Sequence, residues 1–393
     1  MKWKKILTAV ALVFMVTACA APEGINGDMG GDAATGAPAP VTKSIDIYDV
    51  IEDGVAYKVY YGTTRQLNKE GLNQENGPYS VLRDSGINYG SVKVFIPDDR
   101  NRGSLGSRLG ELLGSNRLIK IMQYNRFNTV TQFENAVKAD LLLDGPKDDY
   151  VVVFIHGYNN SFNEAAIRAA QFGYDVGVPK NHMFLFSWPA KFSTATYTND
   201  EATVDVTDVY LAGFLAEVAK VAPNKKIHIV AHSMGNRALL RAINREILSV
   251  STKQKIKFGQ IILAAADVDV DLFAQLAPAY VAASTRTTVF LSPYDNAVGL
   301  SEFIHQYPRV GCGIKPHKPV PGLDYIVSTV PEDFPAHAYI AENVHILNYI
   351  SSLFESNIPL HTGGEWREVR KDNYWLVGPK LIADKEKCDK KGL

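Results

Sequence analysis

The chain has 393 residues, of which 46% are hydrophobic and 21% are charged, and its formal net charge is -1. It is long and apolar enough to bury a substantial core, and one large α/β domain with additions fits its length. The balanced charge, with no Lys/Arg-rich block in the body of the sequence, argues against nucleic acid as a partner.

The first residues are typical of a bacterial export signal. A basic start at 1–5 leads into an apolar run at 6–16 that is too short to span a bilayer. The run ends in Val-Thr-Ala-Cys, which resembles a lipobox, so we expect 1–18 to be a lipoprotein signal peptide and Cys19 to be the lipid attachment site. A plain secretory signal is the alternative. The expected location is the cell envelope, by a lipid anchor; in a Gram-negative source, Ala20 points to the outer membrane, facing the periplasm or the cell surface.

Composition divides the rest of the chain into three parts. Residues 19–45 are rich in Gly, Ala and Pro and predict a flexible tether. Residues 46–355 hold the predicted α/β domain, and 356–393 form a C-terminal extension with an expected hairpin and a charged tail. Cys312 and Cys388 either pair in an oxidising compartment or remain separate thiols, and the sequence leaves both options open.

The domain begins with two strands and then alternates strands with helices. Strands at 57–65 and 90–97 are expected to be antiparallel, with a polar, turn-rich stretch at 66–86 between them. Further strands are expected at 151–155, 182–188, 227–230, 259–265, 287–291 and 324–330, and helices at 161–174, 202–221, 234–248 and 341–354. This alternation predicts a mainly parallel sheet with right-handed crossovers and helices on both faces.

The stretch IHIVAHSMGNRALL, at 227–240, places Ser233 between a predicted strand and a predicted helix. This context is typical of a nucleophile elbow, a turn so tight that the residues two positions before and after the serine must be small. Gly235 meets that requirement, and Ala231 replaces the more usual glycine. Ser233 is therefore a candidate nucleophile, and a serine that only caps the helix is the alternative.

A nucleophilic serine needs a base and an acid that orients the base. In α/β-hydrolases these follow the serine in the order acid, then histidine, in loops after later strands. Asp295 follows the strand at 287–291 and is the favoured acid, while Asp267, after the preceding strand, is its rival. His337 lies in a loop before the final helix and is the expected base. His345, within that helix among apolar residues, is better explained by packing.

An oxyanion hole needs two backbone N–H groups directed at the developing negative charge. Met234, directly after the serine, is expected to supply one. Tyr158 is expected to supply the other from the loop after the strand at 151–155, where Gly157 permits an unusual backbone angle; an ordinary Gly-Asn turn is the alternative. His156 is expected to support this loop, and His232 to point away from the site into the fold.

Several motifs in one order carry a family resemblance: FIHGYNNSF, FSWPA, AHSMGNRAL, LSPYDNAV and HAYIAENV. They resemble a family of bacterial α/β-hydrolases with poorly defined substrates, many members of which are exported or lipid-anchored. The likeness covers 57–355 and implies an α/β-hydrolase fold, with Ser233 as nucleophile, Asp295 as acid and His337 as base. Ala231 departs mildly from the Gly-x-Ser-x-Gly pattern.

The expected function is hydrolysis of carboxylic esters, of small molecules or lipids, through an acyl-enzyme intermediate. Peptidase, thioesterase or acyltransferase chemistry would use the same residues, and a non-catalytic envelope scaffold that retains the fold is a further alternative. Trp188, Phe192 and Tyr197 are candidates to line an acyl pocket that 296–336 could cover. No cofactor or metal is expected, since DVDVDLF lacks the glycine and terminal glutamate of a calcium loop.

Overall fold

The computed structural model describes most of the chain from Asp49 onward. The described residues are 49–68, 77–143, 145, 149–191, 197–248, 256–330, 337–361, 366–369 and 373–379. The expected signal peptide and the whole of the expected tether, 19–45, lie outside these ranges, as do Phe192 and Cys388. Within the described ranges, no helix has both the length and the apolar character needed to cross a bilayer.

The secondary structure alternates as expected along most of the chain. The strands are β1 (Asp49–Ile51), β2 (Gly54–Leu67), β3 (Tyr79–Pro97), β4 (Lys120–Phe127), β5 (Tyr150–Ile155), β6 (Met183–Ser187), β7 (Lys226–His232), β8 (Phe258–Ala264), β9 (Ser284–Leu291), β10 (Asp324–Ser328), β11 (Trp366–Val369) and β12 (Tyr374–Val377). The helices are α2 (Arg108–Leu113), α3 (Val130–Leu141), α4 (Phe162–Val176), α5 (Tyr197–Asp205), α6 (Asp208–Val221), α7 (Gly235–Leu248), α8 (Val270–Leu276), α9 (Pro278–Ala283), α10 (Asn296–His305), α11 (Tyr339–Glu342) and α12 (Val344–Ser356).

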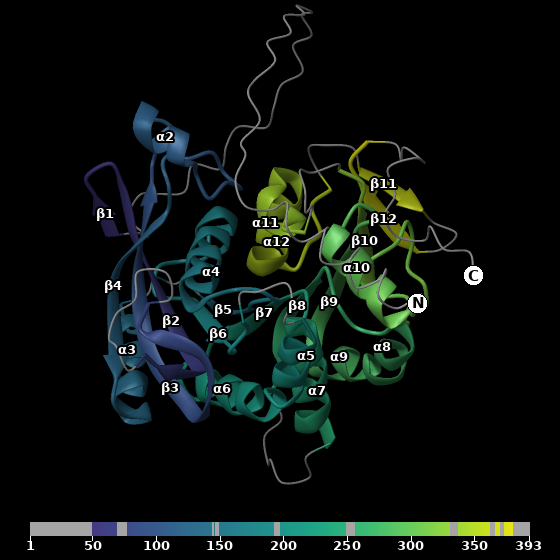
Figure 1. Ribbon diagram of the computed structural model, residues 1–393, viewed down its shortest axis with the longest axis horizontal. Coiled ribbons are helices and arrows are strands. Elements are labelled where there is room, and N and C mark those ends of the chain that lie inside the picture. The colour runs from purple at the N-terminus through teal and green to yellow at the C-terminus, as the bar shows by residue number, and fades with distance from the viewer. Residues whose placement is uncertain are drawn as a thin grey trace, which may run out of the picture.

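One sheet runs through the molecule in the order β11-β12-β10-β9-β8-β7-β5-β6-β2-β3-β4, and β1 pairs with β2. Neighbouring strands from β12 to β2 are parallel, whereas β1, β3, β4 and β11 pair antiparallel. Helices α4, α11 and α12 lie on one face, and α6, α7 and α9 lie on the other (Figure 1). The mainly parallel sheet covered on both faces, and its antiparallel start, are confirmed.

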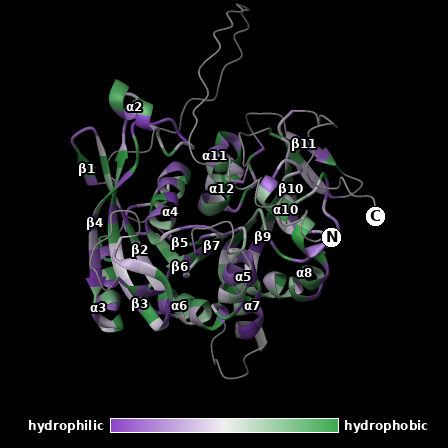
Figure 2. Ribbon diagram, viewed as in Figure 1, coloured by the Kyte–Doolittle hydropathy of each residue, from purple (hydrophilic) through white to green (hydrophobic). Residues whose placement is uncertain are grey.

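The centre and the edge of the sheet differ as their sequences require. Strand β5 is buried along its whole length, as its uninterrupted apolar sequence predicts for a sheet covered on both faces. Strand β4 is the edge strand at the end of the sheet opposite β11, and it is largely hydrophilic in Figure 2. Its exposed Lys120, Gln123, Asn125 and Arg126 protect an open edge against pairing with another chain.

Two helices begin at side chains that cap them. Ser161 and Glu164 form a capping box at the start of α4, since the Ser161 side chain accepts from the Glu164 N–H and the Glu164 carboxylate accepts from the Ser161 N–H. Asp269 caps α8 by accepting from the N–H groups of Asp271 and Leu272.

Two expectations about local structure are wrong. The polar stretch 66–86 predicts turns, yet β3 begins inside it at Tyr79 and pairs with the end of β2. Between residues 80 and 89 no side chain of β3 is fully buried, so backbone pairing forms this part of the strand without an apolar signal. Strand β4 and helices α3 and α10 were likewise not expected.

The helix expected at 202–221 is two helices, α5 and α6. The break falls at Val206 and Thr207, where the Thr207 hydroxyl donates to the carbonyl of Thr203 at 2.9 Å. A threonine hydroxyl that donates to the carbonyl four residues earlier tends to bend or weaken a helix, which favours a boundary here. Helix α5 begins at Tyr197, earlier than expected, and the Tyr197 hydroxyl donates to the Asp267 carboxylate just beyond the end of β8.

Candidate active site

Ser233 lies on a strained turn between β7 and α7. Its φ angle is 52°, a left-handed value that a residue with a Cβ adopts only when the surroundings enforce it. The enforcing contacts come from the neighbouring strand β8 and from Asn236. The Ser233 N–H donates to Ala264 at 2.9 Å, and the Asn236 side chain donates to the carbonyls of Ala231, Ser233 and Ala264. This is the strand-turn-helix geometry of a nucleophile elbow.

The loop after β5 packs directly on this turn. A Cβ added to Gly157 would lie 2.7 Å from the Cβ of Ser233, and one added to Gly235 would lie 2.5 Å from the carbonyl oxygen of His156. Both positions therefore require glycine because the two segments approach each other so closely. The loop that holds Tyr158 therefore packs directly against Ser233.

Asp295 and His337 are brought together by loops after β9 and β10. His337 Nδ1 lies 2.9 and 2.8 Å from the two carboxylate oxygens of Asp295. Asp295 is fully buried and also caps α10 by accepting from the N–H groups of Ala297 and Val298. The cap fixes the carboxylate, and the carboxylate in turn fixes the imidazole so that Nε2 is the nitrogen left for other chemistry.

Electrostatics at His337 favour its protonated form. Burial disfavours the imidazolium, but the charge of Asp295 and its hydrogen bond outweigh burial and raise the pKa of His337 above the ordinary 6.5. The side chain of His337 is 17% exposed, so it reaches solvent in part, unlike the fully buried Asp295. Among the described contacts no hydrogen bond joins Ser233 Oγ to His337; such catalytic hydrogen bonds are often long in ligand-free sites and tighten on substrate binding.

His232 does not point away from the site as expected. Its Nε2 lies 2.8 Å from the backbone carbonyl of His337, and the two rings are 4.5 Å apart. Burial, and then the neighbouring His337, hold the pKa of His232 well below 6.5, so the ring is neutral and can donate this hydrogen bond. The residue beside the elbow serine thus contacts the residue expected to be the base.

Asp267 occupies a different environment from Asp295. Its carboxylate accepts from the hydroxyls of Tyr197 and Ser301, both at 2.5 Å, and Arg309 lies 3.8 Å away. Its contact with the elbow is through the backbone, where the Asp267 N–H donates to the carbonyl of Ser233 at 3.3 Å. No histidine bonds to the Asp267 carboxylate among the described contacts, so its geometry is that of a structural network.

The loop after β5 is held in place by a buried histidine and a tryptophan. His156 stacks on Trp188 at 5.2 Å, and the indole N–H of Trp188 donates to the carbonyl of His156 at 2.9 Å. Burial, followed by the charge of Arg65, lowers the pKa of His156 to about 3, which keeps it neutral. Trp188 is thus a supporting residue rather than the pocket lining that its aromatic character suggested. Tyr197 likewise packs its ring against Tyr158, at 5.3 Å.

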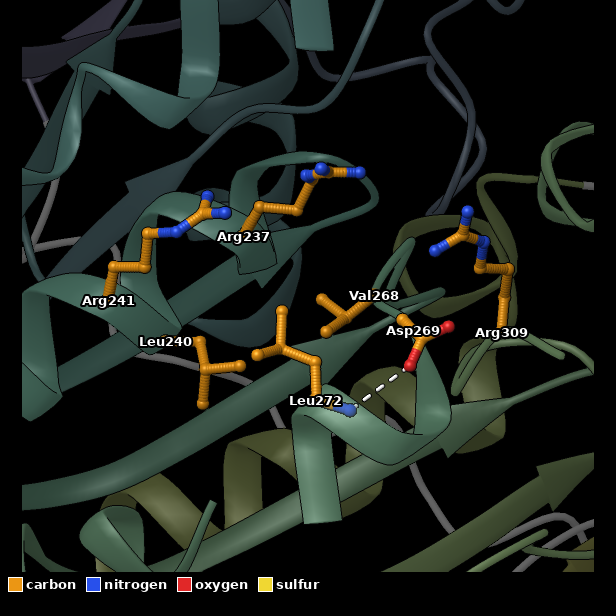
Figure 3. Close-up of a pocket in the computed structure, with 7 residues that line it drawn as sticks. All are labelled: Arg237, Leu240, Arg241, Val268, Asp269, Leu272 and Arg309. Atoms are coloured by element: carbon orange, nitrogen blue, oxygen red, sulfur yellow. Dashed lines mark hydrogen bonds between the residues drawn. The ribbon is translucent and has the colours of Figure 1, made fainter. Parts of the chain in front are cut away.

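A small pocket lies beside Asp267, between α7 and α8. Figure 3 shows Arg237 and Arg309 reaching over it, and Arg237, Leu240, Arg241, Val268, Asp269, Leu272 and Arg309 line it. Arg237 pairs with Glu201 and Asp205, Arg241 pairs with Asp205, and Arg309 lies beside Asp267. Because carboxylates balance the guanidinium groups, the pocket has no excess positive charge.

Two of the other expected residues can be placed only in part. Met234 has a fully buried side chain and directly precedes α7, so its N–H is at the amino end of that helix. Cys312 is buried and disulfide-bonded, while Cys388 lies outside the described residues. No group of three or more His, Cys, Asp or Glu side chains in the described part of the chain is arranged to bind a metal ion.

The sheet topology and the turn at Ser233 define the class: the chain has an α/β-hydrolase fold. Residues 131–320 match the family model described as "Alpha/beta hydrolase of unknown function (DUF900)". No curated protein matches the sequence. Among solved structures, a Trichoderma reesei cutinase in complex with a C11Y4 phosphonate inhibitor is similar at 12% identity and a TM-score of 0.24, over 56% of this chain and 86% of the cutinase. The family-model match supports the resemblance drawn from the motifs at the level of α/β-hydrolases.

Proposed function

We propose that this protein is a serine hydrolase of carboxylic esters, with Ser233 as nucleophile, His337 as general base and Asp295 as the acid that orients it. The observation that carries the proposal is the contact of His337 Nδ1 with both oxygens of the buried Asp295, while His337 also contacts His232, the residue directly before the serine on the strained elbow. A structural serine needs neither the positive φ nor an oriented imidazole nearby.

The chemistry follows from these positions. Ser233 Oγ attacks the ester carbonyl carbon while its proton passes to His337 Nε2, and the tetrahedral intermediate then expels the alcohol, which takes that proton. Water, deprotonated by the same nitrogen, attacks the acyl-enzyme and releases the acid and Ser233. Asp295 remains ionised and stabilises the imidazolium that forms in each half-reaction.

The negative charge of each tetrahedral intermediate requires two hydrogen-bond donors. We assign this role to the backbone N–H groups of Met234 and Tyr158. Met234 adds the positive end of the α7 dipole, and the close approach of Gly157 to Ser233 keeps Tyr158 near the reacting carbon. Loss of one such donor typically lowers the rate by about 10² to 10³.

A fluorophosphonate probe and short-chain p-nitrophenyl esters test the proposal directly. Wild-type protein should be labelled and should hydrolyse the esters, and Ser233→Ala should lose labelling and at least about 10⁴-fold in kcat. Ser292→Ala is the matched control, because Ser292 is a buried serine at the end of β9 that has no proposed role. Equal labelling of wild type and Ser233→Ala would sink the proposal.

We further propose that the enzyme is lipid-anchored in the cell envelope through Cys19, by the lipobox-like Val-Thr-Ala-Cys. Cys19→Ala should move the protein from the membrane fraction to the soluble fraction of the producing cells. Unchanged membrane partitioning, together with no mass increase on the amino-terminal peptide of the wild type, would contradict lipidation while leaving the hydrolase proposal intact.

A further inference from the structure

Arg65 is a buried charge that joins two loops at the candidate site. It lies near the end of β2 and is fully buried. Its Nε donates to Ser187 Oγ at 3.0 Å, its Nη1 to the carbonyl of Ala190 at 3.2 Å and its Nη2 to the carbonyl of Asn160 at 2.7 Å. One guanidinium therefore binds both the loop after β5, which holds Tyr158, and the loop after β6.

Asp200 faces the same two loops through its carboxylate. It is buried on α5, and its Oδ1 accepts from the N–H of Lys191 at 2.8 Å. The backbone N–H of Asn159 faces the carboxylate and lowers its pKa, and Oδ2 has no hydrogen-bond partner among the described residues. The peptide between Ala190 and Lys191 is thus held at its carbonyl by Arg65 and at its N–H by Asp200.

Burying charged side chains costs free energy, so two buried charges beside these loops indicate a specific role. Burial lowers the pKa of Arg65 to about 9, against the charges of Asp200 and Glu164. Burial also raises the pKa of Asp200 to about 6, against the N–H groups of Lys191 and Asn159 and the charge of Arg65. Both groups stay charged at neutral pH, and charge-assisted hydrogen bonds are shorter and stronger than neutral ones.

We propose that Arg65 and Asp200 are positioning residues that hold the Tyr158 N–H in register with Ser233 for oxyanion stabilisation. This inference rests on the proposed function. His156 and Trp188 fix the loop on the amino-terminal side of Tyr158, and the bond of Arg65 to the carbonyl of Asn160 fixes it on the other side. A donor must be held within a few tenths of an ångström to distinguish a tetrahedral oxyanion from a planar ester.

Three substitutions test the inference. Arg65→Met removes the donors and keeps the aliphatic stem, and Asp200→Leu removes the acceptor at similar volume. Asp200→Asn keeps an acceptor at the Oδ1 position and should rescue most of the activity. The matched control is another buried Arg–Asp pair, Arg100 with Asp175, changed to Arg100→Met and Asp175→Leu; Asp175 lies near the far end of α4, roughly 20 Å along the helix from the loop.

The readouts are kcat and KM for a short-chain ester, corrected for the folded fraction, and hydrogen exchange of backbone amides. Arg65→Met and Asp200→Leu should lower kcat about 10- to 100-fold with KM changed less than about threefold, because the donor acts on the transition state. The amides of Asn159 and Lys191 should exchange faster in both variants. Asp200→Asn should stay within about fivefold of wild type, and the control variants within about twofold.

The two proposals fail in different ways. An unlabelled, inactive wild type overturns both. An active wild type whose kcat survives Arg65→Met and Asp200→Leu overturns the positioning role alone, as does an equal loss in the Arg100 and Asp175 controls. If Arg65→Met fails to fold, the comparison of Asp200→Leu with Asp200→Asn decides the test. Unchanged hydrogen exchange at the amides of Asn159 and Lys191 in a folded Asp200→Leu variant contradicts the inference.

Discussion

Asp267 and Asp295 follow neighbouring strands of the same sheet, and both carboxylates are buried, yet their partners differ completely. Asp295 bonds to the imidazole of His337 and to two N–H groups at the start of α10. Asp267 bonds to the hydroxyls of Tyr197 and Ser301. A strand end is therefore a place where either role can arise, and what distinguishes the two positions is the element that packs over each.

Each partner set leaves its carboxylate suited to a different task. The imidazole beside Asp295 can change its charge during a reaction, so the carboxylate there can stabilise a transient cation. The hydroxyls on Asp267 do not ionise near neutral pH; burial, followed by the charge of Asp267, raises the pKa of Tyr197 far above 10. Asp267 thus ties α5 to α10 and acts as a fixed anchor between them.

The largest expected effect separates the two aspartates. Asp295→Asn should lower kcat about 10⁴-fold, since an amide would hold the wrong imidazole tautomer and would not stabilise the imidazolium. Asp267→Asn should stay within about tenfold of wild type. Steady-state hydrolysis of a p-nitrophenyl ester measures both, and a larger loss for Asp267→Asn would transfer the acid role to that residue.

The pH dependence of kcat/KM should reflect the effect of the Asp295 charge on the pKa of His337. Activity needs the neutral imidazole, so kcat/KM should fall about tenfold per pH unit below a midpoint that lies above 6.5, because the pKa of His337 is raised. In Asp295→Asn the opposing burial remains while the charge is lost, so the His337 pKa should drop. NMR titration of the His337 ring follows this shift without requiring activity, and an unmoved pKa would argue that Asp295 is not its main partner.

A smaller effect is expected from the residue that supports the base. His232→Phe keeps the ring but removes the donor to the His337 carbonyl, and we expect a loss of about tenfold in kcat from a less well-placed imidazole. His228→Phe is the control, because His228 is a buried histidine on the same strand that stacks on Phe354. Equal losses in the two variants would mean that the effect of His232→Phe is general destabilisation of β7.

The smallest effect on activity is expected for a change at Tyr197, a hydrogen-bond partner of Asp267. Tyr197→Phe removes one hydroxyl from the Asp267 carboxylate and should reduce the free energy of unfolding by about 1–3 kcal/mol. Its kcat should change only a few-fold. Urea denaturation and ester hydrolysis measured side by side check this, and a kcat loss of 100-fold or more without destabilisation would place Tyr197 in the reaction itself.

Much of this arrangement was accessible from the sequence because it is local or follows chain order. The capping box at Ser161, the cap at Asp269, the uninterrupted strand β5 and the strand-serine-helix at Ser233 depend on residues close together in the chain. The strand-end positions of Asp295 and His337 follow from the order of elements. Catalytic roles for these residues remain proposals.

The parts that were missed depend on contacts between distant segments. The amphipathic sequence pattern around Thr207 contains no signal of a helix break. Strand β3 extends into a polar stretch because β2 offers it a backbone to pair with. The motif VYYGTTR held Arg65, but its acceptors on Ser187, Ala190 and Asn160 lie 95 to 125 residues away in sequence.

The sequence by itself therefore determined the alternation of the parallel strands with helices, the α/β-hydrolase fold and the short set of residues able to act as nucleophile, acid and base. Only the tertiary structure decided which aspartate meets the imidazole, turned His232 onto His337 and joined Arg65 and Asp200 to the loop of Tyr158. The physical reason is that periodicity and chain order are written along the chain, whereas a hydrogen bond across a sheet depends on which loops the packed helices bring together.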